Sequence, residues 1–361
     1  MLARLLLLIL MLVTLPPALL AKDLPKPIEV RLSPPSAGAK FLVTQVETIN
    51  IRQNDRQTVL SERYSDYDLE VLSSGVEGWL VSLMRKQVTW KSSDAKAVSH
   101  IAIMHALESA FADAEIGISR RIRFSPSGKA IGLPDGEKFR AAVLTALPRG
   151  LDRFLLSPDL VRVFGGEQAA VGFVQQVHER ARQNLPGKEP DLLGTWLQHT
   201  LAFPYEVSIQ IGKPVKLDAP LKTIRVIAPT ASETTVTVTQ DAIDPKTLMA
   251  RFKTVYDTEE LTERTLRDQT RRVQAISSRR VKAAPEKQAD YEAWANELIS
   301  RLKSRLSSSR IDRATLVINR ETGWPVSFEA QNVESFQGLT EKMVTTNNVV
   351  SQVVEVRFKR Q

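Results

Sequence analysis

The amino-acid sequence predicts an α+β fold: a large, mostly antiparallel sheet, free to curve, with helices packed on one of its faces. Three observations lead to this prediction. Apolar and polar residues alternate over residues 41–90 and again near the C-terminus, as in half-buried strands. Helical periodicity dominates much of the region between them. A strand–turn–strand pattern at 312–333 needs further strands beside it, because an isolated hairpin is only marginally stable in water.

The first 21 residues have the layout of a secretory signal peptide, with Arg4, an apolar run at 5–13, Pro16 and Pro17, and a small residue at Ala21. A membrane anchor is the competing interpretation. A bilayer span needs about 20 apolar residues, and the prolines interrupt this run earlier. We therefore expect cleavage after Ala21 and a soluble mature chain in the bacterial periplasm or outside the cell.

Residues 22–40 contain several prolines and are expected to form an extended lead-in to a single α+β domain at 41–361. Within that domain the first half is predicted to contain strands and then helices. The expected strands are 41–51, 57–64, 67–72 and 78–90, with turns at 54–55, 65–66 and 73–75. The expected continuation is a buried helix at 93–114, a strand at 115–124, and short helices from 137 to 184 broken at Pro148, Pro158 and Gly165-Gly166.

The second half is predicted to return to strands at 205–211, 221–227 and 233–240. Asp244-Pro245 resembles a helix start, and Leu248, Phe252 and Val255 fit one helical face. Weaker helical periodicity continues to 282, and Pro285 opens a second helix. That helix carries an apolar stripe at Tyr291, Trp294, Leu298, Leu302 and Leu306.

The hairpin at 312–333 and a final strand at 349–359 complete the expected sheet. The hairpin turn contains Gly323, and the residues after it alternate again. Side chains at alternate positions of a strand share a face. We therefore expect three large residues to lie together on the buried face: Trp324, Val326 and Phe328.

Composition bounds the function as well as the fold. The chain has 361 residues, of which 43% are hydrophobic and 25% charged, which is typical of a globular protein. It has no cysteine, so disulfides, thiolate metal sites and lipid attachment at cysteine are excluded. An exported chain without disulfides favours a bacterial envelope over a eukaryotic secretory route.

The order of these features resembles uncharacterised families of exported, β-rich bacterial proteins. The resemblance depends on short motifs at 124–129 (FSPSGK), 193–196 (LGTW) and 321–325 (ETGWP). It implies a β-rich exported protein and assigns no chemistry. The basic helical region from 258 to 310 is an addition to that pattern.

Motifs for catalysis are few. Ser93 and Lys96 have the S-x-x-K spacing of penicillin-recognising enzymes, but the partner motifs S-D-N and K-T-G are missing, so helix capping is favoured. His105 and Glu108 could share a metal, but His100 lies on another helix face. His178 and His199 stand alone in the sequence. The sequence therefore shows no recognisable catalytic, metal or cofactor site.

The strongest surface signal is the helical, basic segment at about 245–310. The net charge is +8, and residues 251–313 hold fifteen Lys or Arg against ten Asp or Glu. Its acids precede its bases, which also suits the helix dipole, so a simply solvated helix is one interpretation. The other is an electrostatic binding site for anionic envelope material. The candidate binding residues are Arg271, Arg272, Arg279 and Arg280.

Two function classes follow. The first is a non-enzymatic envelope protein that binds a lipid, a polymer or another protein. The second is an envelope hydrolase whose site comes from residues distant in sequence. A convergent cluster of Asp, His or Ser in a cleft would favour the hydrolase, and an apolar groove without one would favour the binding protein. Nucleic acid is not expected as a partner of an exported chain.

Overall fold

A computed structural model describes residues 29–30, 36–54, 56–92, 99–126, 130–184, 209–217, 232–339 and 345–361. The predicted signal peptide, most of the lead-in, the Ser93–Lys96 motif, His199 and the strand expected at 221–227 lie outside these ranges.

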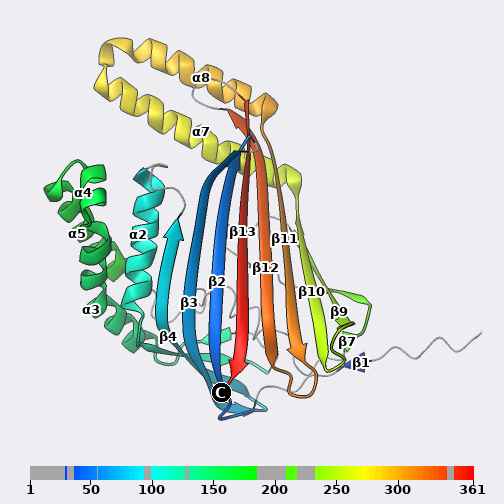
Figure 1. Cartoon of the computed structure of the whole chain (residues 1–361). Helices are drawn as coiled ribbons and strands as arrows, with labels where there is room; N and C mark the ends of the chain where they lie inside the picture. Colours follow the sequence, from blue (N-terminus) through cyan, green and yellow to red (C-terminus); the bar gives the residue numbers. More distant parts are fainter. Residues whose placement is uncertain are drawn as a thin grey trace, which may run out of the picture.

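Eleven strands form one antiparallel sheet in the order β6-β5-β4-β3-β2-β13-β12-β11-β10-β9-β8 (Figure 1). The predicted fold class is confirmed. Two meanders from opposite ends of the chain join where β2 pairs with β13. The strands are β2 (Lys40–Gln53), β3 (Arg56–Gly75), β4 (Gly78–Ser92), β5 (Ser119–Phe124), β6 (Ala130–Gly132), β8 (Pro214–Leu217), β9 (Ser232–Gln240), β10 (Thr247–Tyr256), β11 (Ser307–Asn319), β12 (Pro325–Leu339) and β13 (Thr345–Arg360).

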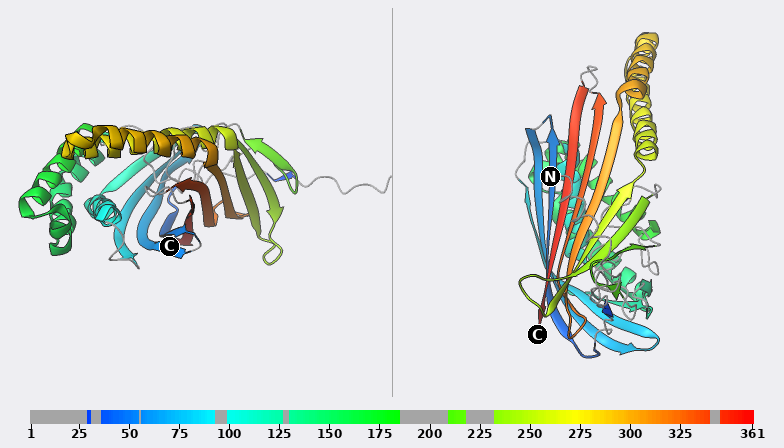
Figure 2. Two further views of the ribbon diagram at one scale, coloured as in Figure 1. Left: turned by 90° about the horizontal axis from the view of Figure 1, so that it is seen from above. Right: turned by 90° about the vertical axis from the view of Figure 1, so that its right-hand side faces the viewer.

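The sheet is open and twisted. Its edges are β6 and β8, and strand direction turns steadily across it (Figure 2). A two-stranded pair, β1 (Glu29–Val30) with β7 (Ile209–Gln210), forms a separate small sheet beside β9 (Figure 1). One face, here called the inner face, carries the main apolar cluster, whose largest fully buried side chains include Phe124, Phe328 and Leu69.

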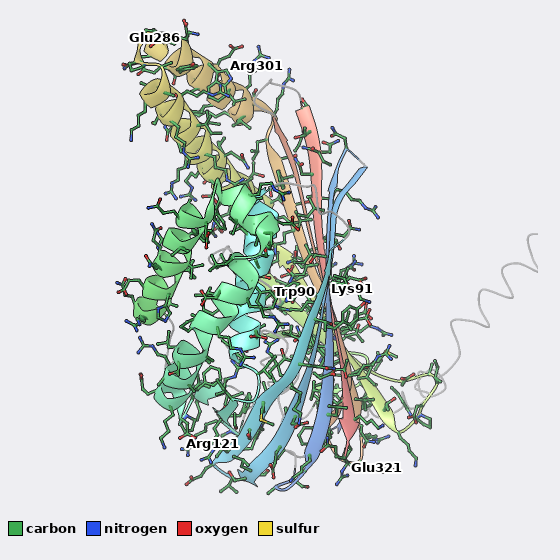
Figure 3. All side chains as sticks on the ribbon, turned by 60° about the vertical axis from the view of Figure 1, so that its left-hand side comes forward. Trp90, Lys91, Arg121, Glu286, Arg301 and Glu321 are labelled. Carbon is green, nitrogen blue, oxygen red and sulfur yellow. The ribbon has the colours of Figure 1, made fainter. Side chains whose placement is uncertain are left out.

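The helices lie on the inner side of the sheet. Trp90 points to that side and its neighbour Lys91 to the other (Figure 3). A second apolar cluster joins four helices: α2 (Ser99–Ala114), α3 (Gly136–Leu155), α4 (Pro158–Phe164) and α5 (Glu167–Asn184). The break predicted at Pro148 is wrong, because Pro148 lies inside α3, where buried Leu147 and Leu151 anchor the helix on either side. The breaks at Pro158 and Gly165-Gly166 are confirmed.

The close crossing of α2 and α3 positions α2 over the sheet. A methyl group at Gly150 of α3 would lie 2.7 Å from the carbonyl oxygen of Ala110 in α2. Only glycine allows this approach, which helps to explain the alanine-rich sequence of α2. The far side of α2 contacts β4.

The helix predicted from Asp244-Pro245 is wrong, because residues 247–256 form β10. Leu248, Ala250 and Phe252 are buried at alternate positions. Apolar residues four apart suit a strand face as well as a helix face, so the periodicity was ambiguous. Asp244 instead caps a turn, where its Oδ1 accepts a hydrogen bond from the Lys246 N–H at 2.9 Å.

The strands expected at 57–64 and 67–72 are one continuous strand, β3, so the predicted turn at 65–66 is also wrong. The pairing of β3 with β4 shifts in register between Asp66 and Tyr67, and β3 continues through this point. Ser65 is buried and accepts a hydrogen bond from Arg85 Nη1 at 3.0 Å. Because its hydroxyl group has this partner, Ser65 can be buried within the strand, although its polar side chain suggested a turn.

The hairpin β11–β12 confirms the predicted turn but not the position of Val326. Trp324 and Phe328 are buried, whereas Val326 is 40% exposed. A register shift pairs Val317 with Ser327 and Ile318 with Pro325. This bulge removes Val326 from the alternation.

Helices α7 (Thr258–Ala283) and α8 (Gln288–Arg305), with the short η3 (Pro285–Lys287), form a hairpin at one end of the sheet (Figure 1). This hairpin, residues 258–305, is called the arm. The boundary predicted at 245–310 is corrected, since 247–256 and 307–310 are strand residues. The arm has its own apolar cluster, including Val273, Leu298 and Leu302, and contacts β11 and β12 at its root.

Candidate functional site

The arm begins after Asp257, and not at the helix start expected from Asp244-Pro245. The Asp257 carboxylate caps α7 and accepts hydrogen bonds from the N–H groups of Glu259 and Glu260 at 2.9 and 3.0 Å. Acidic residues in the first turn and basic residues in the last suit the helix dipole. The apolar stripe of α8 then packs on α7, and most of the basic side chains of α7 face outward.

Between residues 264 and 282 the chain has seven Lys or Arg and one acid, Asp268. At 3.6 residues per turn, six of these basic residues fall within an arc of about 140° around α7. Arg264 is partly buried and the other five are exposed. This surface is called the basic arc: Arg264, Arg267, Arg271, Arg272, Arg279 and Lys282.

The structure separates the four arginines proposed from the sequence. Arg271, Arg272 and Arg279 belong to the basic arc, and Arg271 lies 3.9 Å from Asp268. Arg280 lies on the opposite side of α7, where its guanidinium stacks 4.5 Å from the centre of the Trp294 ring in α8. Arg280 therefore helps to hold the arm together. Arg267 and Lys282, which were not among the four candidate residues, are exposed and belong to the basic arc.

A second polar feature crosses the inner face and was not predicted. Polar side chains from seven strands that are neighbours in the sheet, in the order β4-β3-β2-β13-β12-β11-β10, interrupt an otherwise apolar surface. They are called the polar belt: Gln45, Glu47, Arg63, Ser65, Tyr67, Arg85, Tyr256, Arg310, Asp312, Asn332 and Gln352.

One end of the belt surrounds Asp312 of β11. Its side chain is fully buried and pairs with Arg310, 3.1 Å away. Tyr256 and Asn332 also donate hydrogen bonds to this carboxylate. The pKa of Tyr256 is raised, mainly by burial and to a smaller extent by the hydrogen bond to Asp312. Buried charge is therefore well compensated here, and the cluster fixes the root of the arm, because Tyr256 precedes the N-cap of α7.

The other end of the belt lies beneath α2. Arg85 of β4 donates to Glu115 at 3.1 and 3.2 Å, and Arg63 of β3 pairs with Glu47 of β2. Burial works against the charged form of Arg85, but Tyr67, Glu115 and Glu47 outweigh it and raise its pKa. Arg85 therefore stays charged at physiological pH.

Two features are absent from the described residues. Among them, no group of three or more His, Cys, Asp or Glu side chains could hold a metal ion. His178 lies on α5, and the His105 side chain is outside the described part. Within the described ranges, no helix has the length and apolarity that crossing a bilayer requires.

No family model matches this chain, and no curated protein matches it. Among solved structures it is similar to one titled "Lipid-protein interactions in lipovitellin", with 8% sequence identity and a TM-score of 0.38. The match covers 90% of this chain and 26% of that chain, so this chain spans about a quarter of that protein's length. A likeness this weak supports no functional conclusion.

Proposed function

We propose that this chain is an exported, non-enzymatic protein of the bacterial envelope that docks on anionic membrane surfaces through the basic arc. The observation that carries the proposal is the projecting arm, which presents at least five exposed cations on one side of α7. The signal-like first 21 residues and the absence of cysteine support the envelope location.

The geometry suits electrostatic docking. A straight helix of about 1.5 Å rise per residue places the six cations along roughly 27 Å, so a flat surface can contact them together. Each basic residue near an anionic surface contributes about 1 kcal/mol. The attraction should fall with salt, because the Debye length shortens from about 30 Å at 0.01 M to about 8 Å at 0.15 M.

The test is sedimentation with vesicles of phosphatidylglycerol and phosphatidylcholine at low salt. The test variant changes Arg267, Arg271, Arg272 and Arg279 to Gln and leaves Arg280 on Trp294. A matched control removes four exposed cations elsewhere: Arg123, Lys138, Arg149 and Arg180.

Both variants have the same net charge, so a general charge effect weakens both equally. We expect the arm variant to lose at least about 10-fold in association, since four contacts of about 1 kcal/mol are removed. The control should keep most of the wild-type binding. Equal retention of wild type and arm variant would leave the basic arc as a solvated helix face and overturn the proposal.

A further inference from the structure

Beneath α2 a pocket of about 380 Å³ joins charged and apolar walls. Helix α2 supplies an apolar wall and one acid, and the polar belt supplies two arginines. The volume is within the usual range for small-ligand sites, about 300–1,000 Å³. The lining residues are Arg63, Arg85, Leu107, Glu108, Phe111, Ala112 and Glu115.

Both guanidinium groups in this pocket are held in fixed positions. Arg85 is tied to Glu115 and Ser65, and its guanidinium lies 4.9 Å from the centre of the Tyr67 ring. Arg63 is paired with Glu47 and lies 5.1 Å from the centre of the Trp90 ring. Such preorganised groups lose little freedom when a ligand binds.

Arg63 also has donor capacity that the described part of the chain does not use. A guanidinium has five N–H donors. The Nε of Arg63 is buried, and no hydrogen-bond partner for it occurs among the described residues. A buried donor without a partner is unfavourable and is often satisfied by a bound molecule. Arg63 lines the pocket, so its guanidinium group is placed beside an acceptor that enters it.

The charges around the pocket select the kind of ligand. Two cations, Arg63 and Arg85, are accompanied by three carboxylates, Glu47, Glu108 and Glu115. Among these five described side chains negative charge exceeds positive charge by one, so a purely anionic ligand gains little from them. A ligand with both signs can contact the guanidinium groups with its anion and the carboxylates with its cation.

We propose that the α2 pocket binds a zwitterionic phosphoester with a primary ammonium, of the phosphoethanolamine type. Its phosphate contacts Arg63 and Arg85, and its ammonium contacts Glu108. A primary ammonium fits better than a quaternary one, because it can donate hydrogen bonds to a carboxylate, whereas quaternary ammonium favours an aromatic cage. Leu107 and Phe111 are placed to contact an attached glycerol or acyl chain.

This site is independent of the basic arc. The arc is attracted to net negative charge, whereas the pocket requires paired charges. The experiment on the pocket can therefore fail while the docking proposal stands, and the reverse also holds. The same phosphoester occurs in lipid head groups and in soluble glycerophosphoethanolamine, and the experiment separates these sources.

Calorimetry with short-chain, monomeric lipids tests the pocket. We expect wild type to bind dihexanoyl phosphatidylethanolamine at least about 10-fold more tightly than the phosphatidylglycerol and phosphatidylcholine analogues, as one charge-assisted contact implies. If dihexanoyl phosphatidylethanolamine also binds about 10-fold more tightly than glycerophosphoethanolamine, the ligand is a lipid. Equal binding of those two identifies the soluble phosphoester as the ligand and still supports the site.

Two variants make the test sharper. Glu108→Gln keeps the shape of the side chain and removes a negative charge. It should therefore weaken the binding of phosphatidylethanolamine and strengthen the binding of phosphatidylglycerol. Arg63→Gln should weaken both, and Arg63→Lys should restore part of the affinity. Glu137→Gln, an exposed change on α3, is the control. No binding of phosphatidylethanolamine by wild type, or unchanged selectivity in Glu108→Gln, would overturn the proposal.

Discussion

Replacing Phe328 by alanine should destabilise the whole sheet. Phe328 is 2% exposed and lies in β12 between Leu316 of β11 and Val356 of β13. It therefore joins the C-terminal hairpin to the strand that pairs with β2. Truncation of a fully buried phenylalanine costs about 3–5 kcal/mol, from lost burial and the cavity left behind. Trp324→Ala should cost a similar amount, because Trp324 contacts Phe41 of β2 with ring centres 3.9 Å apart.

Val326 provides the matched control. It lies in the same strand, two residues away, but is 40% exposed because of the bulge. Val326→Ala should change the free energy of unfolding by less than about 1 kcal/mol. Urea denaturation followed by circular dichroism measures all three variants. A cost below about 1 kcal/mol for Phe328→Ala, or equal costs for Phe328→Ala and Val326→Ala, would refute the proposed packing.

Three further predictions concern single contacts. Asp312→Ala should cost about 3–5 kcal/mol in urea denaturation, because it leaves buried Arg310 without its carboxylate; a cost below 1 kcal/mol would contradict this. Gly150→Ala should lower the melting temperature, because its methyl group would meet the Ala110 carbonyl at 2.7 Å; Gly172→Ala, with open space at that position, is the control. Burial raises the pKa of Glu334, Arg310 opposes this and Asp312 adds to it. A raised folded-state pKa costs stability at higher pH, and the cost disappears as pH falls toward the unfolded value, about 4.3. Glu334→Gln should therefore be more stable than wild type at pH 7, with the gap closing near pH 4. A gap that widens on acidification would show the opposite sign.

Long alternating segments were predicted well because one buried face constrains every second residue. This holds for β2, β9 and β11 from residue 312 onward, and α8 was located from Pro285 and its apolar stripe. The start of α7 was not located, because the helix start expected at Asp244-Pro245 was wrong. The failures share a cause in tertiary structure. In β10, Leu248 and Phe252 fit both periods, and only pairing with β9 and β11 decides between them. Val326 leaves the buried face because of a bulge that depends on the partner strand.

The two candidate sites differed in how far sequence could reveal them. The basic arc lies on one helix, so its residues are close in sequence and their spacing was informative. The position of Arg280 outside the basic arc was not evident from sequence, because its stacking partner, Trp294, lies on the other helix. The polar belt comes from seven strands, and only the strand order brings Arg63, Glu47 and Arg85 together. One signal was present: Gln45 and Glu47 continue the alternate positions of buried Phe41 and Val43.

The most direct test of the proposed membrane docking uses the fact that the chain has no cysteine. A single cysteine at Ser278, exposed beside the basic arc, can carry one polarity-sensitive dye. A second variant places the dye at exposed Thr145 of α3. With phosphatidylglycerol vesicles at low salt, the dye at Ser278 should report a less polar environment, and this change should reverse at high salt. The dye at Thr145 should not respond. No change at Ser278, or an equal change at both positions, would contradict docking through the arm.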